Sequence, residues 1–198
     1  MGQSYRNKYL AVHVVLNTTN ESRFPKMTER QKYQVIREFD GFELRRYEPC
    51  VIAEVEMSDD YQSATYGAFR HLFNYISKGN ETSKSIAMTA PVIAASEQSS
   101  TNPNWKIAFV MPSGSKLKDL PAPTDSRVVL RELPAEEAVA ISFRGRANKR
   151  LAAKMESELR QKAQAANISL KSETRINRFD PPFKPGFLHF NEVVIPTN

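Results

Sequence analysis

Apolar and polar residues alternate along many short stretches of this chain, and two longer stretches repeat at helical spacing instead. A period of two is typical of half-buried strands, and a recurrence at three and four residues is typical of amphipathic helices. The alternation predicts strands at residues 32–38, 42–47, 51–57, 85–94, 105–111, 128–133, 138–143, 174–179 and 188–195. The helical spacing predicts helices at residues 61–77 and 147–166.

The order of these predicted elements repeats. In the first half FELRRYEPCVIAEVEM precedes a helix and further strands, and in the second half VVLRELPAEEAVAISF does the same. Each has an arginine-bearing strand, then a proline (Pro49 or Pro134), then an alternating strand. The proline- and serine-rich stretch 113–126 separates the halves. Two such β-β-α-β units, at about 33–112 and 127–196, predict an α+β fold whose strands pair across a pseudo-twofold axis.

The stretch SIAMTAPV, residues 85–92, is an unusual strand candidate. Its alternation is expected to point one set of side chains into the core: Ile86, Met88, Ala90 and Val92. Pro91 cannot donate to a sheet ladder, which favours an edge or a bulge at this point. The hydroxyl of Thr89 is expected either to satisfy an edge backbone group or to face a cleft.

The two predicted helices differ in the width of their apolar face. The second has one narrow stripe, formed by Leu151, Met155, Leu159 and Ala166, as a helix lying on a core does. The first has an apolar arc that covers roughly half of its circumference, formed by Tyr61, Thr65, Tyr66, Ala68, Phe69, Leu72, Phe73, Tyr75 and Ile76. Either its own chain covers this helix on two sides, or part of the arc lines an apolar pocket.

Composition narrows the function classes. The 198 residues, 40% hydrophobic and 25% charged, suffice for one domain with a sizeable core. The net charge of +6 is concentrated at the start, because residues 1–32 hold six basic side chains against two acidic ones. We expect residues 1–32 to be an extension outside the domain or a disordered segment, with Met27 as an alternative start, and residues 33–198 to form a single domain. Without a nucleic-acid-binding motif, this surplus does not predict a nucleic-acid partner.

The N-terminal region and the cysteine content also bear on location. The apolar run at residues 8–16 is too short to span a bilayer, so no membrane span is predicted. Cys50 is the single cysteine, which excludes an intramolecular disulfide and a cysteine-based metal site. These features favour a reducing, cytoplasmic location.

Several longer motifs resemble those of a known family. The segments YQVIREFDGFELRRYEP, AFRHLFNYISKGNE, SIAMTAPVI, FVMP and DPPFKPGFLHFNEVVI occur in this order between residues 33 and 195. In them the chain resembles the SOUL/haem-binding protein family. The resemblance implies a distorted antiparallel β-barrel of two pseudo-symmetric halves flanked by two helices, a fold shared with effector-binding domains of bacterial multidrug-type regulators. It also implies that haem or another tetrapyrrole binds in an apolar cleft beside the first helix.

The resemblance carries over a set of cofactor-binding residues, which in this chain are Tyr66, Phe69, Arg70, Phe73, Asn74 and Lys184. Aromatic and aliphatic contacts suit a flat apolar porphyrin, and cations at the rim suit its propionates. One branch of the family has a proposed axial histidine where this chain has Arg46. Because a guanidinium stays protonated, any haem is expected to be held mainly by apolar contact.

The other ligand-type side chains are predicted to be structural, and no metal site is predicted. His71 is expected to be a solvated residue on the flank of the first helix, His189 to lie on a strand face, and His13 to lie in the N-terminal extension. The methionines at alternating strand positions are expected to fill the core: Met57, Met88 and Met111. Cys50 is expected to act as a small hydrophobic residue.

Nothing in the sequence points to catalysis. It contains no Gly-rich phosphate loop, nucleophile elbow or His–Glu metal pair. We therefore expect a non-catalytic protein that carries, buffers or senses haem or another tetrapyrrole. Two alternatives stay open: an effector-binding or protein-interaction module without tetrapyrrole affinity, and an enzyme that degrades or dechelates tetrapyrroles.

Overall fold

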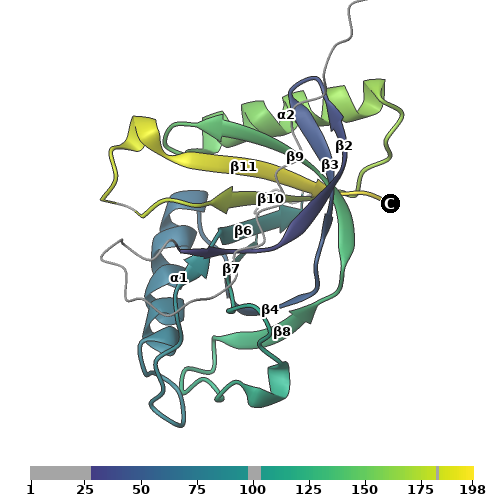
Figure 1. Ribbon diagram of the computed structural model, residues 1–198. Helices are drawn as coiled ribbons and strands as arrows, with labels where there is room; N and C mark the ends of the chain where they lie inside the picture. Colours follow the sequence, from purple (N-terminus) through teal and green to yellow (C-terminus); the bar gives the residue numbers. More distant parts are fainter. Residues whose placement is uncertain (1–27, 98–103, 182) are drawn as a thin grey trace, which may run out of the picture.

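The computed structural model describes residues 28–97, 104–181 and 183–198 of the chain (Figure 1). The predictions for residues 1–27, which include His13 and the start at Met27, lie outside the described residues. Just beyond them, β1 (Glu29–Arg30) pairs in parallel with β5 (Thr89–Ala90), and the Gln31 amide donates to the Ala90 carbonyl.

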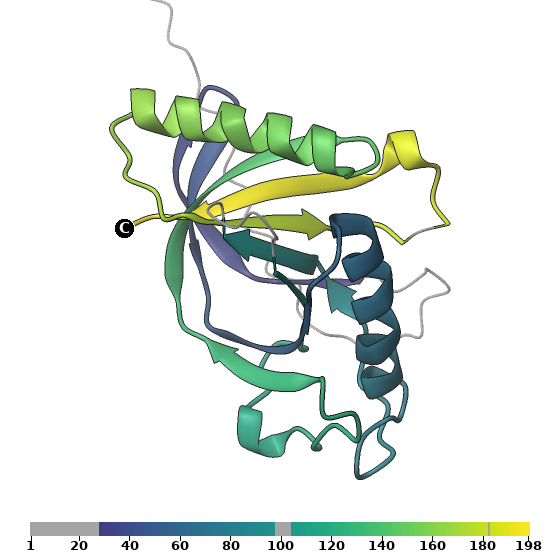
Figure 2. The same cartoon turned by 180° about the vertical axis from the view of Figure 1, so that it is seen from behind.

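A single curled antiparallel sheet forms the body of the protein (Figures 1 and 2). Its strands run in the order β2-β3-β9-β11-β10-β6-β7-β4-β8. Their bounds are β2 Tyr33–Phe39, β3 Phe42–Tyr47, β4 Cys50–Met57, β6 Val92–Glu97, β7 Trp105–Val110, β8 Val129–Leu133, β9 Glu136–Arg144, β10 Glu173–Arg178 and β11 Phe190–Pro196. This half-barrel with two helices confirms the predicted α+β fold.

The sheet order contains the repeat seen in the sequence. Strands β3, β4, β6 and β7 of the first half correspond to β8, β9, β10 and β11 of the second. On one side of the centre the sheet has the order β3-β9-β11-β10. On the other side, from the edge inwards, it has the corresponding order β8-β4-β7-β6. The halves therefore meet where β10 pairs with β6, across a pseudo-twofold axis. The arginine-bearing strand of each half pairs with the return strand of the other, because β3 pairs with β9 and β8 pairs with β4.

Both predicted helices are confirmed to within two residues. Helix α1 spans Tyr61–Ile76 and begins where the Asp60 carboxylate accepts from the amides of the first turn. Helix α2 spans Lys149–Ala165 and begins at Asn148, whose side chain accepts from the Leu151 amide. On the outer face of the sheet, α1 packs on β4 and β7, and α2 packs on β9 and β11.

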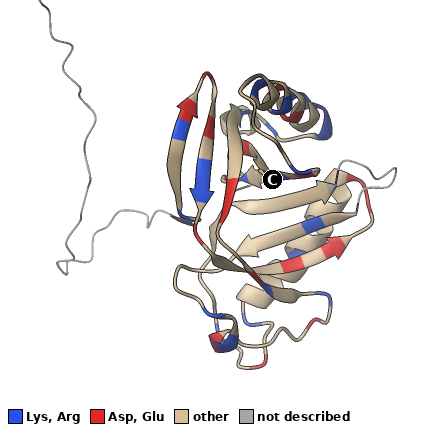
Figure 3. Ribbon diagram, turned by 90° about the vertical axis from the view of Figure 1, so that its right-hand side faces the viewer, with Lys and Arg blue, Asp and Glu red and all other residues tan. Residues whose placement is uncertain are grey.

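The two faces of the sheet differ in chemistry. The helix-covered face is apolar and forms the main core. It includes the alternating residues of the strand that follows Pro49 or Pro134 in each half: Val51, Ala53, Val55, Val139, Ile141 and Phe143. The concave face combines small apolar clusters with charged side chains. Figure 3 shows basic and acidic positions side by side on β2 and β3, so this hairpin carries both signs of charge.

The predicted strand at 85–94 is wrong in its first half. Residues 85–88 do not form part of a β-strand. The Ile86 amide instead donates to the Ile76 carbonyl, which holds this segment against the end of α1. Met88 is 39% exposed, so it does not fill the core, although Met111 is buried as predicted. Thr89 is buried, and its hydroxyl donates to the Val110 carbonyl, which is the first of its two expected roles.

Candidate ligand site on helix α1

The apolar arc of α1 has one covered side and one open side. The covered side contributes Tyr61, Ala64, Thr65, Ala68, His71, Leu72, Tyr75 and Ile76 to the buried residues. On the open side Tyr66 is 69% exposed and Phe73 is 49% exposed. Isolated exposed apolar residues are ordinary, but exposed aromatic residues on one helix face are typical of a binding surface.

The part of the chain between the halves covers one flank of α1. The Tyr75 hydroxyl donates to the Pro121 carbonyl, and His71 Nδ1 lies 2.8 Å from Asp125 Oδ2. His71 is therefore buried, and its prediction as a solvated residue is wrong. Helical periodicity places His71 away from Phe69, but it cannot show that a segment 50 residues later covers that flank.

Phe69 fixes the geometry of the open face. Its ring stacks with Phe73 at a centroid distance of 5.8 Å and an interplanar angle of 11°. The same ring meets Phe109 of β7 edge-on at 5.3 Å. Because Phe69 is held from below by the sheet, the neighbouring aromatic ring on the surface has a fixed support.

The polar residues predicted for this face have different environments. Arg70 is exposed, and none of the ion pairs among the described residues includes it. Asn74 belongs to the C-terminal end of α1, where its carbonyl accepts from the Gly79 amide at 2.7 Å. Arg70 is thus available to an external anion, and Asn74 also has a structural role.

Lys184 comes from the β10–β11 loop, and its charge is already paired. Its Nζ lies 2.8 Å from Asp180 Oδ1, and the other carboxylate oxygen of Asp180 accepts from the Phe190 amide. Burial opposes ionisation of Asp180, but these hydrogen bonds outweigh it and hold the pKa of Asp180 below its ordinary value. The charge of Lys184 is therefore only partly available to an external anion.

The same loop carries exposed aromatic residues of its own. Phe183 is 88% exposed and Phe187 is 75% exposed. A short 3-10 helix, η2 (Gly186–Leu188), shapes the loop, which lies near the N-terminal end of α1 (Figure 2). His189 follows η2 and is buried, with Nε2 2.8 Å from the Lys184 carbonyl. It lies before β11 rather than on a strand face, so that prediction is wrong.

A small pocket of about 30 Å³ joins this loop to α1. Its lining comes from α1, from the turn between β9 and α2, from β10 and from the residue before β11: Tyr61, Gln62, Thr65, Tyr66, Arg146, Ala147, Arg178 and His189. Of the predicted site residues, it includes Tyr66. One sequence signal could have identified Arg178. Residues 174, 176 and 178 alternate along one strand, so Arg178 lies on the same face of the sheet as Thr174 and Ile176, which are buried.

Arg46, which stands where one family branch has its proposed axial histidine, is not beside α1. Its side chain is 62% exposed, and Nη2 lies 2.5 Å from Glu137 Oε1 on β9. In the sheet order β3 is separated from β7, on which α1 packs, by β9, β11, β10 and β6. The arginine at this position therefore leaves the aromatic face of α1 unchanged.

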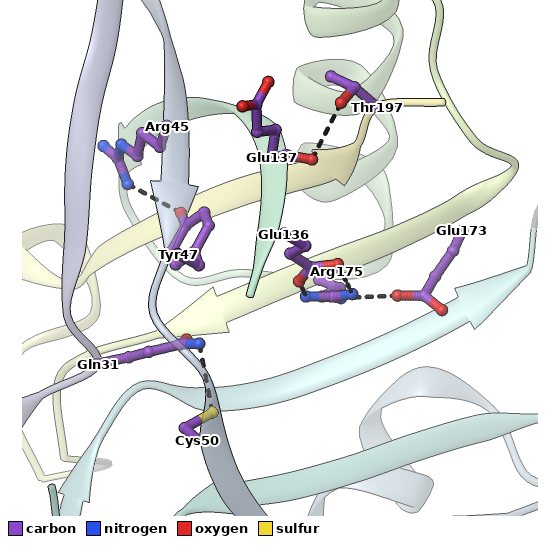
Figure 4. A network of polar contacts seen from close by, with 9 residues as sticks. All are labelled: Gln31, Arg45, Tyr47, Cys50, Glu136, Glu137, Glu173, Arg175 and Thr197. Atoms are coloured by element: carbon purple, nitrogen blue, oxygen red, sulfur yellow. Dashed lines mark hydrogen bonds and ion pairs between the residues drawn. The ribbon is translucent and has the colours of Figure 1, made fainter. Parts of the chain in front are cut away.

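The concave face holds a second group of polar residues (Figure 4). Arg175 forms ion pairs with Glu136 and Glu173. Gln31 Nε2 donates to Cys50 Sγ at 3.6 Å, and burial raises the pKa of the Cys50 thiol to about 11. A hollow of about 250 Å³ lies next to Cys50, but charged residues such as Glu29, Lys32 and Lys116 line it. Such a lining suits a tetrapyrrole ring poorly.

Within 28–97, 104–181 and 183–198, no group of three or more His, Cys, Asp or Glu side chains is placed to hold a metal ion. Among the helices in these ranges, none is both long enough and apolar enough to cross a bilayer.

Known proteins resemble this chain in sequence and in fold. The sequence profile described as SOUL heme-binding protein matches residues 28–196. Heme-binding protein 1 of Xenopus laevis is 29% identical over 155 residues, which cover 75% of this chain and 80% of that protein.

Among solved structures, the C-terminal domain of EcmrR has a TM-score of 0.62 at 14% identity and covers 84% of this chain and 98% of its own. A hydrolase from Listeria innocua has a TM-score of 0.54 at 13% identity, covering 79% and 91% of the two chains. At such identities the structural likeness shows a common fold.

Proposed function

Because the chain belongs to the SOUL haem-binding protein family, we propose that it binds haem or another tetrapyrrole on the open aromatic face of α1, without catalysis. The observation that carries this proposal is the exposure of Tyr66 and Phe73 above the sheet-supported ring of Phe69. A flat macrocycle that covers these rings removes apolar area from water on both partners, and this burial is favourable.

The residues present fit apolar retention of a tetrapyrrole better than tight metal ligation. The predicted face offers aromatic rings, with Arg70 at its rim, and contains neither a histidine nor a cysteine. A carrier, buffer or sensor of haem must also release its ligand, and a site built mainly on apolar contact permits this. We include Asn74 of α1 and Lys184 of the β10–β11 loop in the proposed site as polar residues for the ligand's edge.

A haemin titration tests the proposal. Haemin added to the purified full chain is expected to shift and sharpen its Soret band until one site is filled, and Phe73→Asp is expected to abolish the shift. Val129→Asp is the matched control, since Val129 is 51% exposed and pairs with Glu54 on the face of the sheet opposite to the one that α1 covers. If the Phe73→Asp protein binds haemin as the wild type does, the ligand site does not lie on this face.

The runner-up is an effector-binding or protein-interaction module that uses the same face without tetrapyrrole affinity. It predicts an unchanged Soret band in the same titration.

A further inference from the structure

Tyr61, at the start of α1, is buried, yet its hydroxyl has no hydrogen-bond partner among the described residues. Only 3% of the residue is exposed, and its ring packs against Trp105 at a centroid distance of 4.9 Å. Buried polar groups are usually paired, because an unpaired hydroxyl loses its contacts with water and gains nothing in exchange. A buried donor without a partner therefore points to a ligand or water that completes it.

The pocket that Tyr61 lines is cationic. Arg146 and Arg178 line it as well, and neither forms an ion pair with a carboxylate of the described residues. The lining of this pocket contains no acidic side chain, and in the adjoining segments Asp60 caps α1 while Asp180 binds Lys184. The N-terminal end of α1 adds a partial positive charge on the same side.

Both arginines of the pocket are held by contacts between separate elements of the fold. Arg178 ends β10, on the face of the sheet that the helices cover. Arg146 lies against η2, where a side chain at Gly186 would begin 3.5 Å from Arg146 Nε. The Gly145 amide donates to the His189 carbonyl, so the turn after β9 is tied to the β10–β11 loop.

We propose that the pocket between Tyr61, Arg146 and Arg178 binds the carboxylate of an amphipathic ligand whose apolar body lies on the open face of α1. A guanidinium group matches the two oxygens of a carboxylate, and the Tyr61 hydroxyl gains an acceptor. The volume of about 30 Å³ admits a head group and excludes a ring system. Tyr66 lines the pocket and is also part of the aromatic face, so it connects the two parts of the site.

This proposal rests on the proposed function only for the identity of the ligand, a tetrapyrrole with ionised propionates. Two pairs of probes distinguish the tetrapyrrole site on α1 from the carboxylate pocket. Haemin and its dimethyl ester share the macrocycle and differ in carboxylate charge, whereas decanoate and methyl decanoate present the same comparison without a macrocycle. Trp105 is the only tryptophan of the chain and touches Tyr61, so its fluorescence reports on this pocket for decanoate.

The expected result is a charge preference that depends on Arg178. Haemin is expected to bind the wild type about tenfold to a hundredfold more tightly than its dimethyl ester, which is the usual effect of hydrogen bonds to a charged group. In Arg178→Gln and Arg146→Gln the preference is expected to shrink, with little change for the ester. Arg150→Gln, an exposed residue of α2 that does not line the pocket, is the control for net charge.

Tyr61→Phe distinguishes a binding role from a structural one. Because the hydroxyl has no partner in the free protein, its removal is expected to leave the thermal midpoint unchanged or raise it, while haemin binding weakens. A hydroxyl with a purely structural role would give a lower midpoint and unchanged binding.

Each outcome decides the matter. If haemin and its ester bind equally and Arg178→Gln changes neither, the tetrapyrrole site stands and the carboxylate pocket is refuted. If neither tetrapyrrole binds but decanoate quenches Trp105 in an Arg178-dependent manner, the pocket stands and its ligand is a fatty acid or a similar carboxylate. If neither tetrapyrrole binds and decanoate does not quench Trp105 fluorescence, both proposals are wrong.

Discussion

Arg45 and Glu192 form a buried bidentate ion pair, in which Nη1 and Nη2 of Arg45 lie 2.9 and 3.0 Å from Oε2 and Oε1 of Glu192. Both side chains are about 4% exposed on the concave face. The pair joins β3 to β11 across β9, so it connects residues that are 147 positions apart. Each charge compensates the burial of the other.

Removal of one member of this pair is expected to be costly. Glu192→Gln removes the buried counter-charge of Arg45 and leaves only the more exposed Glu43, 2.7 Å from Arg45 Nε. We therefore expect a loss at the lower end of about 3–5 kcal/mol in the free energy of unfolding. The double variant Arg45→Met, Glu192→Leu is expected to lose clearly less than the sum of the two single changes. Urea denaturation of Glu192→Gln, of the double variant and of its components Arg45→Met and Glu192→Leu measures these losses.

The exposed pair on the opposite face is the control. Arg46 lies next to Arg45 in β3 and pairs with Glu137, but its side chain is 62% exposed. Arg46→Met is expected to cost about 1 kcal/mol or less. Equal losses for Glu192→Gln and Arg46→Met would contradict a special role for the buried pair.

Acid is expected to weaken the contact between α1 and the segment that covers it. Hydrogen bonds from Arg127, with smaller contributions that include His71, lower the pKa of Asp125 to about 2. Because the pKa of this carboxyl is lower in the folded state, its stabilising contribution is complete above the unfolded value near 3.8. The contribution is lost as the pH falls from about 4 to about 2.

The variant Asp125→Asn tests this link. It is expected to be less stable than the wild type at neutral pH and to lose less stability between pH 4 and pH 2. Urea midpoints at a series of pH values, at constant ionic strength, measure the difference. Parallel curves for the two proteins would show that Asp125 does not contribute in this range.

A glycine holds the end of α1 close to the candidate site. A Cβ at Gly79 would lie 2.4 Å from Asn74 Nδ2 and 2.7 Å from the Asn74 carbonyl oxygen. Gly79→Ala is therefore expected to cost about 1–3 kcal/mol, because the backbone oxygen cannot move away easily. Thermal unfolding of Gly79→Ala and Gly186→Ala measures the contrast, since the nearest atom at Gly186 is 3.5 Å away. Equal melting temperatures would mean that the helix end adjusts freely.

Cys50 is expected to react slowly with alkylating reagents. Burial raises the pKa of its thiol to about 11, so at pH 8 only about one molecule in a thousand carries the reactive thiolate. Iodoacetamide labelling followed by mass spectrometry should be slow in the native protein and fast in urea, where the pKa returns to about 8.5. Rapid native labelling would show that the thiol is accessible and readily ionised.

Much of the fold follows from local sequence patterns. The strands after Pro49 and Pro134 were predicted from their alternation, and they form β4 and β9, with Val55 and Val139 in the core. Both helices were predicted from their spacing, and the second begins two residues later than predicted, at Lys149. The side chains of Asp60 and Asn148 satisfy free amides of the first turns. Such signals can be read from the sequence because they depend on neighbours within a few residues.

The candidate site was only partly predictable. Helical spacing identified Tyr66, Phe69 and Phe73 as one face of α1. It could not predict which part of the apolar arc another segment of the chain would cover. Residues 121–125 cover the flank with His71 and Tyr75 and leave the other flank open. The pocket of Tyr61, Arg146 and Arg178 was missed because its members come from separate elements of both halves.

The sequence by itself determined the alternating strands, the two helices and the repeat, since each depends on a local period or on composition. Only the tertiary structure decided that β3 pairs with β9 and β8 with β4, which side of α1 remains open, and that Arg178 lies beside Tyr61. These outcomes depend on long-range packing, in which the burial of one segment is fixed by another that no local pattern specifies.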